Sequence, residues 1–166
     1  MKIDVFGLTE GENRVHFSEE AAVLDLPGEL QAQTSVEVNA VVTKRGAHLV
    51  LKGDATCTLN MECSRCLQPF WHRLQARLEV FYMLGGKRAD DREDDDVIRI
   101  AHSDQEVDLA GKVREAMLLA IPIKPLCREE CKGLCPRCGV NRNRGECGCI
   151  TRTPDPRLAV LRDLCK

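Results

Sequence analysis

Ten cysteines in a chain of 166 residues constrain this sequence more than any other feature. Eight of them form closely spaced pairs, which are Cys63 and Cys66, Cys127 and Cys131, Cys135 and Cys138, and Cys147 and Cys149. The N-terminus has neither an apolar stretch of signal-peptide length nor a small-residue cleavage site, so we expect the chain to stay in a reducing cytosol. Thiols remain reduced there, and this spacing therefore favours metal binding or redox work over disulfides.

Counting ligands predicts two metal sites with four thiolates each. The second site is local, because a Cys-x-x-Cys pair is followed closely by a Cys-x-Cys pair, and its ligands are Cys135, Cys138, Cys147 and Cys149. The remaining pairs each lack two ligands, so we expect them to combine into a first site made of Cys63, Cys66, Cys127 and Cys131. Four-thiolate coordination is the closed, structural kind of zinc site, which predicts one or two structural zinc ions.

Two cysteines remain outside these sets. Cys57 lies on the apolar face of a predicted strand, and Cys165 follows a terminal amphipathic turn. Free cysteine packs as a small hydrophobic residue, so we expect neither of them to be a ligand.

The sequence predicts an α+β protein, with an antiparallel β-sheet or a partly open barrel and one packing helix in residues 1–120. Apolar residues recur with a period of two from Thr34 to Tyr82, as half-buried strands require, and a short strand is expected at residues 97–101. Asp108 is suited to cap a helix with an apolar stripe that ends before Pro122. The glycine-led, acidic residues 85–96 are expected to form a solvated loop. Since no apolar run reaches the roughly 20 residues of a membrane helix, we expect no membrane span.

Residues 121–166 are expected to form a cysteine-rich zinc-binding segment that ends in a short helix opened by Asp155 and Pro156. This segment is basic, with ten Lys or Arg against five Asp or Glu. Some of these cations are expected to neutralise the thiolates. The residues considered as contacts to RNA or another partner are Lys132, Arg137, Arg142, Arg144, Arg152 and Arg157.

The partner suggested by this charge is either RNA or a protein. The basic segment contains no Phe, Trp or Tyr, so an RNA contact there would depend on phosphates and shape. A basic protein tail is the alternative partner, through the acidic stretch from Asp90 to Asp96.

A cysteine-based redox or iron–sulfur enzyme is the alternative function. Cys131, Cys135 and Cys138 have the C-x3-C-x2-C spacing of radical S-adenosylmethionine enzymes, but such enzymes use a barrel of about 200 residues or more, and too little chain follows Cys138. Neither Cys-x-x-Cys pair lies in the strand-to-helix turn of a thiol oxidoreductase.

Three segments resemble a known family. They are E-C-S-R-C-L-Q-P-F at 62–70, I-P-I-K-P-L-C-R-E-E-C-K-G-L-C-P-R-C-G at 121–139, and C-G-C at 147–149 followed by D-P-R-L at 155–158. Together with V-D-L at 107–109, their order and spacing resemble the YceD family, which is named for large ribosomal RNA subunit accumulation. The resemblance implies a bacterial, cytosolic, non-enzymatic factor for the large ribosomal subunit, with its RNA or one of its proteins as partner. The loop at 140–145 is richer in arginine than this family's pattern.

Overall fold

The computed structural model describes residues 1–26, 31–32, 35–85, 97–101 and 105–149. The chain divides into two compact units. The sheet unit comprises Met1–Met61 and Phe70–Ile123, and the cysteine unit comprises Glu62–Pro69 and Lys124–Lys166. The predicted C-terminal helix, Cys165, Arg152, Arg157 and the acidic stretch from 90 to 96 lie outside the described residues.

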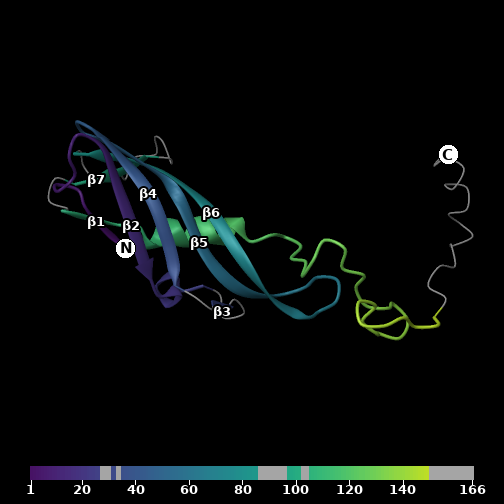
Figure 1. The fold of residues 1–166 in the computed structure, drawn as a ribbon. Helices are drawn as coiled ribbons and strands as arrows, with labels where there is room; N and C mark the ends of the chain where they lie inside the picture. Colours follow the sequence, from purple (N-terminus) through teal and green to yellow (C-terminus); the bar gives the residue numbers. More distant parts are fainter. Residues whose placement is uncertain (27–30, 33–34, 86–96, 102–104, 150–166) are drawn as a thin grey trace, which may run out of the picture. The chain divides into compact units, whose positions relative to one another are not determined.

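Strands make up most of the described sheet unit (Figure 1). In chain order the elements are β1 (Lys2–Asp4), β2 (Gly11–Glu19), the short 3-10 helix η1 (Ala21–Leu24), β3 (Gln31–Ala32), β4 (Val36–Arg45), β5 (His48–Glu62), β6 (Pro69–Leu84), β7 (Val97–Ile100), β8 (Glu106–Asp108) and α1 (Ala110–Ala120).

The main sheet has the strand order β2-β4-β5-β6-β7, and β3 pairs with β5 beside this path. The antiparallel pattern predicted from the period of two is confirmed for β4 and β5. The predicted antiparallel arrangement is wrong for the edge strand β7, which runs parallel to β6, with Phe81 opposite Val97. A short apolar strand has no local signal that fixes its direction, so the sequence did not reveal this pairing.

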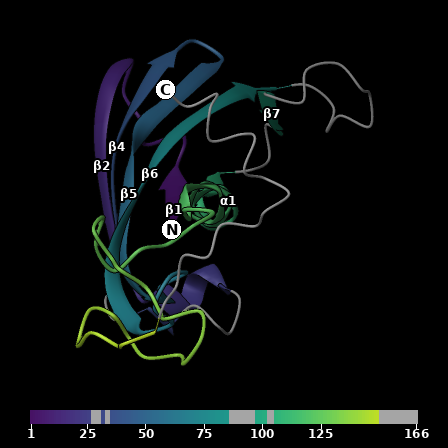
Figure 2. The same ribbon diagram turned by 90° about the vertical axis from the view of Figure 1, so that its right-hand side faces the viewer.

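The sheet is open, so the barrel alternative is not realised. Figure 2 shows β2, β4, β5 and β6 as one curved layer, with α1 and β1 on the same side of it. No helix or strand of the described residues covers the opposite face, which we call the outer face. The structure therefore has one buried and one exposed sheet face, as alternating strands require.

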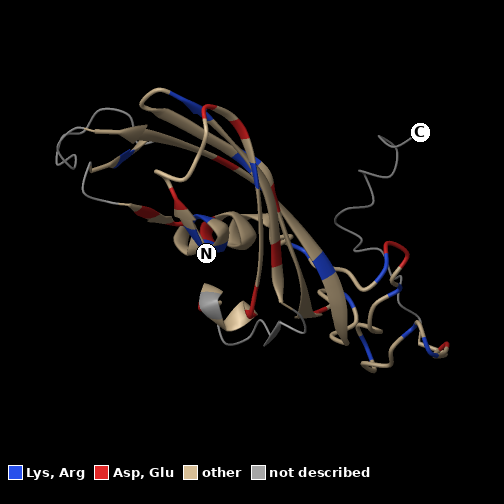
Figure 3. Cartoon of the chain, turned by 60° about the vertical axis from the view of Figure 1, so that its left-hand side comes forward, with Lys and Arg blue, Asp and Glu red and all other residues tan. Residues whose placement is uncertain are grey.

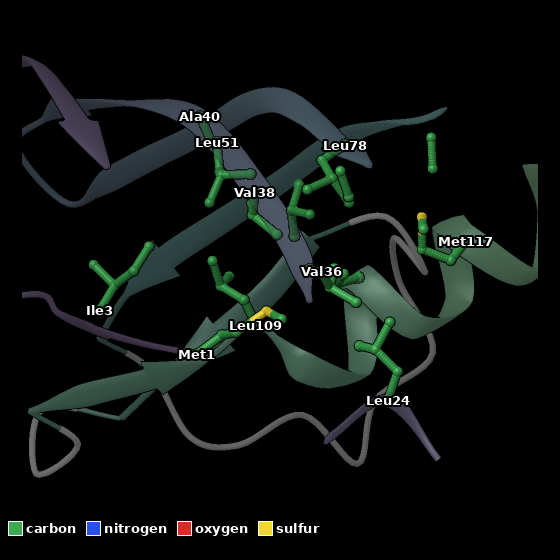
Figure 4. Close-up of a cluster of buried hydrophobic side chains, with 14 of the residues drawn as sticks. Met1, Ile3, Leu24, Val36, Val38, Ala40, Leu51, Leu78, Leu109 and Met117 are labelled. Atoms are coloured by element: carbon green, nitrogen blue, oxygen red, sulfur yellow. The ribbon is translucent and has the colours of Figure 1, made fainter. Parts of the chain in front are cut away.

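The core lies between the inner face of the sheet and α1 (Figure 4). Val36, Val38 and Leu51 are buried on the sheet side, and Val113 and Met117 are buried on the helix. The predicted packing helix is therefore confirmed. The N-cap residue is Leu109, one residue after the predicted Asp108. The Asp108 carboxylate nevertheless accepts a hydrogen bond from the backbone N–H of Ala110 at 2.9 Å, at the start of the helix.

The N-terminal strands were not predicted. β2 pairs antiparallel with β4 along its whole length, although Val15 and Phe17 are its only large apolar residues. β1 and β8 form a separate two-stranded sheet in which Ile3 lies opposite Val107. Strands of three residues are too short to show a period of two. No helix among the described residues has the length and apolar character that a membrane crossing requires.

Candidate metal centre

The first Cys-x-x-Cys pair lies at the tip of a hairpin, as the sequence predicted. β5 ends at Glu62 and β6 begins at Pro69, which leaves Cys63 and Cys66 in the connection. The N–H of Cys63 donates to the carbonyl of Gln68 at 3.0 Å, and the N–H of Leu67 donates to the carbonyl of Cys63 at 2.9 Å. These two bonds fold the connection into a tight turn.

The second pair repeats this turn. The N–H of Cys135 donates to the carbonyl of Val140 at 2.8 Å, and the N–H of Gly139 donates to the carbonyl of Cys135 at 2.9 Å. The residue after the second cysteine is left-handed in both turns, with φ of 73° at Gly139 and 55° at Leu67. Glycine adopts this conformation without strain, whereas a side chain in it costs about 1–2 kcal/mol. The turn therefore forms at Leu67 against its local preference.

The structure brings together the same two sets of four cysteines that the spacing predicts. The four sulfur atoms within each set all lie within 4.8 Å of one another. In the first cluster, Cys63, Cys66, Cys127 and Cys131, two of the sulfur pairs are each 3.8 Å apart. Four thiolates arranged tetrahedrally at about 2.3 Å from one ion lie about 3.8 Å apart. This spacing suits a single tetrahedral ion.

The two clusters differ in burial. In the first cluster, Cys63, Cys66 and Cys131 are at most 4% exposed, and Cys127 is the most accessible ligand. In the second cluster, Cys135, Cys138, Cys147 and Cys149, only Cys135 is buried. Its four ligands all lie within Cys135–Cys149, so this cluster requires no distant part of the chain.

Backbone N–H groups prepare the leading cysteine of each turn to act as a thiolate. Burial raises the pKa of Cys63, but N–H groups of Cys127, Arg65 and Cys66 donate to its sulfur and lower the pKa to about 6. In the second turn, N–H groups of Cys138 and Arg137 lower the pKa of Cys135 to about 6. Both turns thus stabilise negative sulfur, which is the form that binds metal.

Other ligands hold their protons more tightly. Burial raises the pKa of Cys127 to about 12, and the neighbouring sulfurs of Cys131, Cys63 and Cys66 add to this effect. A second cysteine with a raised pKa is Cys149, at about 12, mainly through the sulfur of Cys138 and then burial. A divalent cation favours the thiolate form of every ligand, so metal binding would release these protons.

Asn143 connects the chain around the second cluster to a sulfur of the first. Its Nδ2 donates to Sγ of Cys131 at 3.3 Å. Its Oδ1 accepts from the N–H of Lys132 at 2.9 Å and from the guanidinium of Arg128 at 2.7 Å. Its Nδ2 also donates to Asn141 at 2.9 Å. Such partners of metal ligands orient the sulfur and stabilise its charge.

Arg65 holds the two halves of the first cluster together. Its guanidinium donates to the carbonyl of Cys131 at 2.9 Å and to the carbonyl of Glu129 at 3.0 Å. Neither Arg65 nor Asn143 was predicted from the sequence. The available signal was their position between ligands, Arg65 between Cys63 and Cys66 and Asn143 between Cys138 and Cys147, because a polar side chain there is close to backbone groups that need partners.

The predicted partner-contact residues have different surroundings. Arg144 donates to Oε1 of Gln68 at 2.7 Å, so it already has a structural partner. No ion pair or side-chain hydrogen bond engages the charged groups of Lys132, Arg137 or Arg142 within the described chain. Cys57 is buried in the core of the sheet unit and belongs to neither cluster, and burial raises its pKa to about 11.

These features define a class of small sheet proteins that carry a cysteine unit with two four-sulfur clusters. The family described as large ribosomal RNA subunit accumulation protein YceD matches residues 51–165, so the chain belongs to the YceD family. The resemblance noted from the cysteine segments is thereby confirmed.

Known relatives agree with this assignment. An uncharacterized protein of Mycobacterium bovis is 36% identical over 104 residues, which cover 62% of this chain and 49% of the relative. A maize protein named large ribosomal RNA subunit accumulation protein YCED homolog 1, chloroplastic, is 26% identical over 74% of this chain and 51% of its own length. Its Arabidopsis thaliana namesake is 22% identical over 79% and 49%. The chain thus matches about half the length of these relatives. No solved structure matches it.

Proposed function

We propose that this chain is a non-enzymatic, zinc-stabilised RNA-binding factor that supports accumulation or assembly of the large ribosomal subunit and its RNA. The family membership and the names of the two plant relatives support the link to large-subunit RNA. The proposal places the chain in a reducing compartment, the cytosol of a bacterium, where its thiolates remain available for metal.

Zinc is the metal we propose, because four thiolates around one tetrahedral ion form the usual structural zinc site. All four sulfurs of each cluster lie within 4.8 Å of one another, close to the edges of a tetrahedron around one ion. An iron–sulfur cluster binds its cysteines through separate iron atoms and spreads them further apart. Zinc supplies a fixed tetrahedral crosslink, and the residues that would hold it are the two sets of four cysteines.

The closed donor sets favour a structural role over catalysis. Catalytic zinc sites have three protein ligands and an open position for water or substrate, whereas each cluster here offers four sulfurs. A redox or iron–sulfur enzyme remains the alternative. It predicts metal-free cycling thiols or visible absorbance from iron.

The observation that carries RNA binding is a pair of unengaged cations beside the second cluster. Lys132 and Arg142 line one hollow together with Glu146 and Cys147. Within the described chain neither cation has an ion pair, and Glu146 pairs with neither of them. The adjacent four-thiolate zinc would carry a net charge of about −2, so a cation in contact with phosphate must extend away from the sulfurs. Exposed Arg137 is a further candidate. Figure 3 shows blue Lys and Arg segments within the cysteine unit.

Salt-dependent binding tests this proposal directly. Large-subunit ribosomal RNA is titrated with the zinc-loaded chain and with a Lys132→Gln, Arg142→Gln double variant. Each phosphate contact that is removed should reduce the slope of log K against log salt by about 0.7–0.9, so the double variant should reduce it by about 1.4–1.8. The matched control is Glu146→Gln, which removes the acid of the same hollow and should bind at least as tightly. Equal affinity of the double variant and the native chain at every salt concentration would contradict this contact.

Elemental analysis tests the proposed zinc content, and a cellular assay tests the proposed role in accumulation of large-subunit RNA. Two zinc ions per chain, with no iron, are expected after purification without added metal. In a cell that depends on this chain, its loss should lower the ratio of large-subunit to small-subunit ribosomal RNA, and the native chain should restore the ratio. Restoration by a variant that lacks both clusters would show that zinc is dispensable.

A further inference from the structure

The outer face of the sheet has the composition of a surface that binds single strands. Along β6 the exposed residues alternate with the core residues, and they are Pro69, Trp71, Arg73, Gln75, Arg77, Glu79 and Phe81. Trp71 is 49% exposed and Phe81 is 37% exposed. Aromatic rings separated by arginines on an uncovered sheet present both stacking surfaces and phosphate contacts.

The middle of this face is hollowed and cationic. The hollow spans β2, β4, β5 and β6, and Arg14, Lys52 and Arg77 line it. Arg14 and Lys52 flank Val41 in one row of the sheet, because Val41 pairs with both of them. Since neighbouring strands lie about 4.8 Å apart, the backbone positions of Arg14 and Lys52 are about 10 Å from each other.

The acids of the hollow are already engaged. Glu79 forms an ion pair with Lys52 at 2.7 Å, and Asp54 accepts a hydrogen bond from Gln75 at 3.3 Å. Within the described residues, Arg14 and Arg77 form no ion pair. The hollow is lined by three cationic side chains, Arg14, Lys52 and Arg77, against two carboxylates, Asp54 and Glu79, so its charge balance is positive.

A second hollow joins the aromatic end of β6 to the same surface. Phe81 lines it beside Arg45, His48 and Lys52, and Lys52 also lines the first hollow. A base stacked on Phe81 would place its phosphate near Arg45, and the strand could continue along the cations of the first hollow. The two hollows thus meet at Lys52, which lines both of them.

We infer that the outer face of β2, β4, β5 and β6 binds single-stranded RNA, with Trp71 and Phe81 stacking on bases and Arg14, Arg45 and Arg77 contacting phosphates. This inference rests on the proposed RNA-binding function. It supplies the stacking groups that the cysteine-rich segment does not contain. A duplex is excluded as the preferred ligand, because paired bases do not expose their faces to the rings.

Trp71 makes the test direct, because it is the only tryptophan of the chain. The zinc-loaded full chain is titrated with a single-stranded RNA of about 12 nucleotides, within the size range of single-strand sites, and with a hairpin RNA. Stacking should quench Trp71 emission with the single strand, in parallel with the anisotropy of the labelled RNA. The hairpin should quench much less.

Variants separate stacking from charge. Trp71→Ala and Phe81→Ala should each weaken binding roughly 5- to 150-fold, the range of one base stack, and Trp71→Phe should retain most of the affinity. Arg77→Gln should lower the salt slope by about 0.7. Glu79→Gln is the matched control from the same face and should bind as tightly as the native chain, or more tightly. Zinc content and the melting temperature verify that each variant is folded.

The possible outcomes separate failure of the sheet-surface inference from failure of the proposed RNA-binding function. If RNA binds while Trp71 emission and both alanine variants are unchanged, the sheet surface is wrong and the proposed function stands. If the native chain binds no RNA, the proposed function fails and this surface fails with it. If Trp71→Ala instead dissociates a dimer of the native chain and RNA affinity is unaffected, the aromatic residues belong to a protein interface and the inference is overturned.

Discussion

The two cysteine clusters contain the same kind of Cys-x-x-Cys turn and four cysteines each, but they differ in the sequence separation of their cysteines and in burial. The first cluster joins residues that are 61 and 68 positions apart and buries most of its sulfurs. The second lies within Cys135–Cys149 and leaves most of its sulfurs accessible. An ion bound by the first cluster would act as a tertiary crosslink, whereas an ion bound by the second would organise one short segment.

The difference in sequence separation between the two clusters predicts a difference in how much each crosslink stabilises the fold. A crosslink removes conformational entropy from the unfolded chain, by about 3 kcal/mol for a loop of 15 residues and about 1 kcal/mol more for a loop several times longer. The first cluster also leaves buried thiols without compensation if its ion is lost. We therefore expect the two clusters to differ in stability, in metal exchange and in tolerance of substitution.

Removing one ligand from each cluster should produce the largest difference. Cys63→Ser should lose one zinc ion and destabilise the whole chain by about 3 kcal/mol or more, because it opens the long-range crosslink. Cys138→Ser should also lose one ion, but its effect should be confined to the segment near residues 135–149. Zinc analysis with thermal unfolding and hydrogen exchange measures both. Cys57→Ala is the control, a buried cysteine outside the clusters, and it should retain both ions.

Asn143 allows the first cluster to be weakened without removal of a ligand. Asn143→Asp replaces the N–H donor to Cys131 with a carboxylate, and the loss of such a partner typically lowers metal affinity 10- to 100-fold. Competition with a chromogenic chelator measures this affinity. Asn141→Asp is the control, because Oδ1 of Asn141 acts as an acceptor for Asn143 and the carboxylate preserves that role. Equal affinities in the two variants would show that the bond to sulfur has no effect.

Chelation kinetics should show the same contrast in the native chain. The accessible second cluster should release its ion about tenfold faster than the first, the ratio produced by a difference of about 1.4 kcal/mol in local opening. A chelator added to the zinc-loaded protein should therefore give two phases of equal amplitude. Cys138→Ser should lack the fast phase, and a single phase in the native chain would contradict the comparison.

The left-handed residue of each turn offers the smallest and most local test. Gly139→Ala should destabilise the second turn by about 1 kcal/mol, because the added Cβ meets no neighbour and only the positive φ opposes it. Leu67→Gly should be neutral or stabilising by up to about 1 kcal/mol, since Leu67 is 54% exposed and strained. Gly148→Ala, which has open space and no positive φ, is the control. Thermal unfolding measures all three.

The sequence predicted the cysteine sets well because sulfur spacing is a local and chemically restrictive signal. The period of two likewise located β4, β5 and β6 through their alternating buried residues. It did not locate β2, whose exposed face of Glu12, Arg14 and His16 dominates its composition. The parallel pairing of β7, the β1–β8 sheet and the bond from Asn143 to Cys131 depend on contacts between distant residues. No local pattern encodes such contacts.

The separation of 61 positions between Cys66 and Cys127 also has a consequence for biosynthesis. A ribosome that adds about 5–20 residues per second needs roughly 3–12 seconds to pass from one pair to the next. During that interval the nascent chain carries only two of the four sulfurs of the first cluster. Truncated products that end before Cys127 can never complete it. A filled first cluster therefore marks chains whose translation has passed this point.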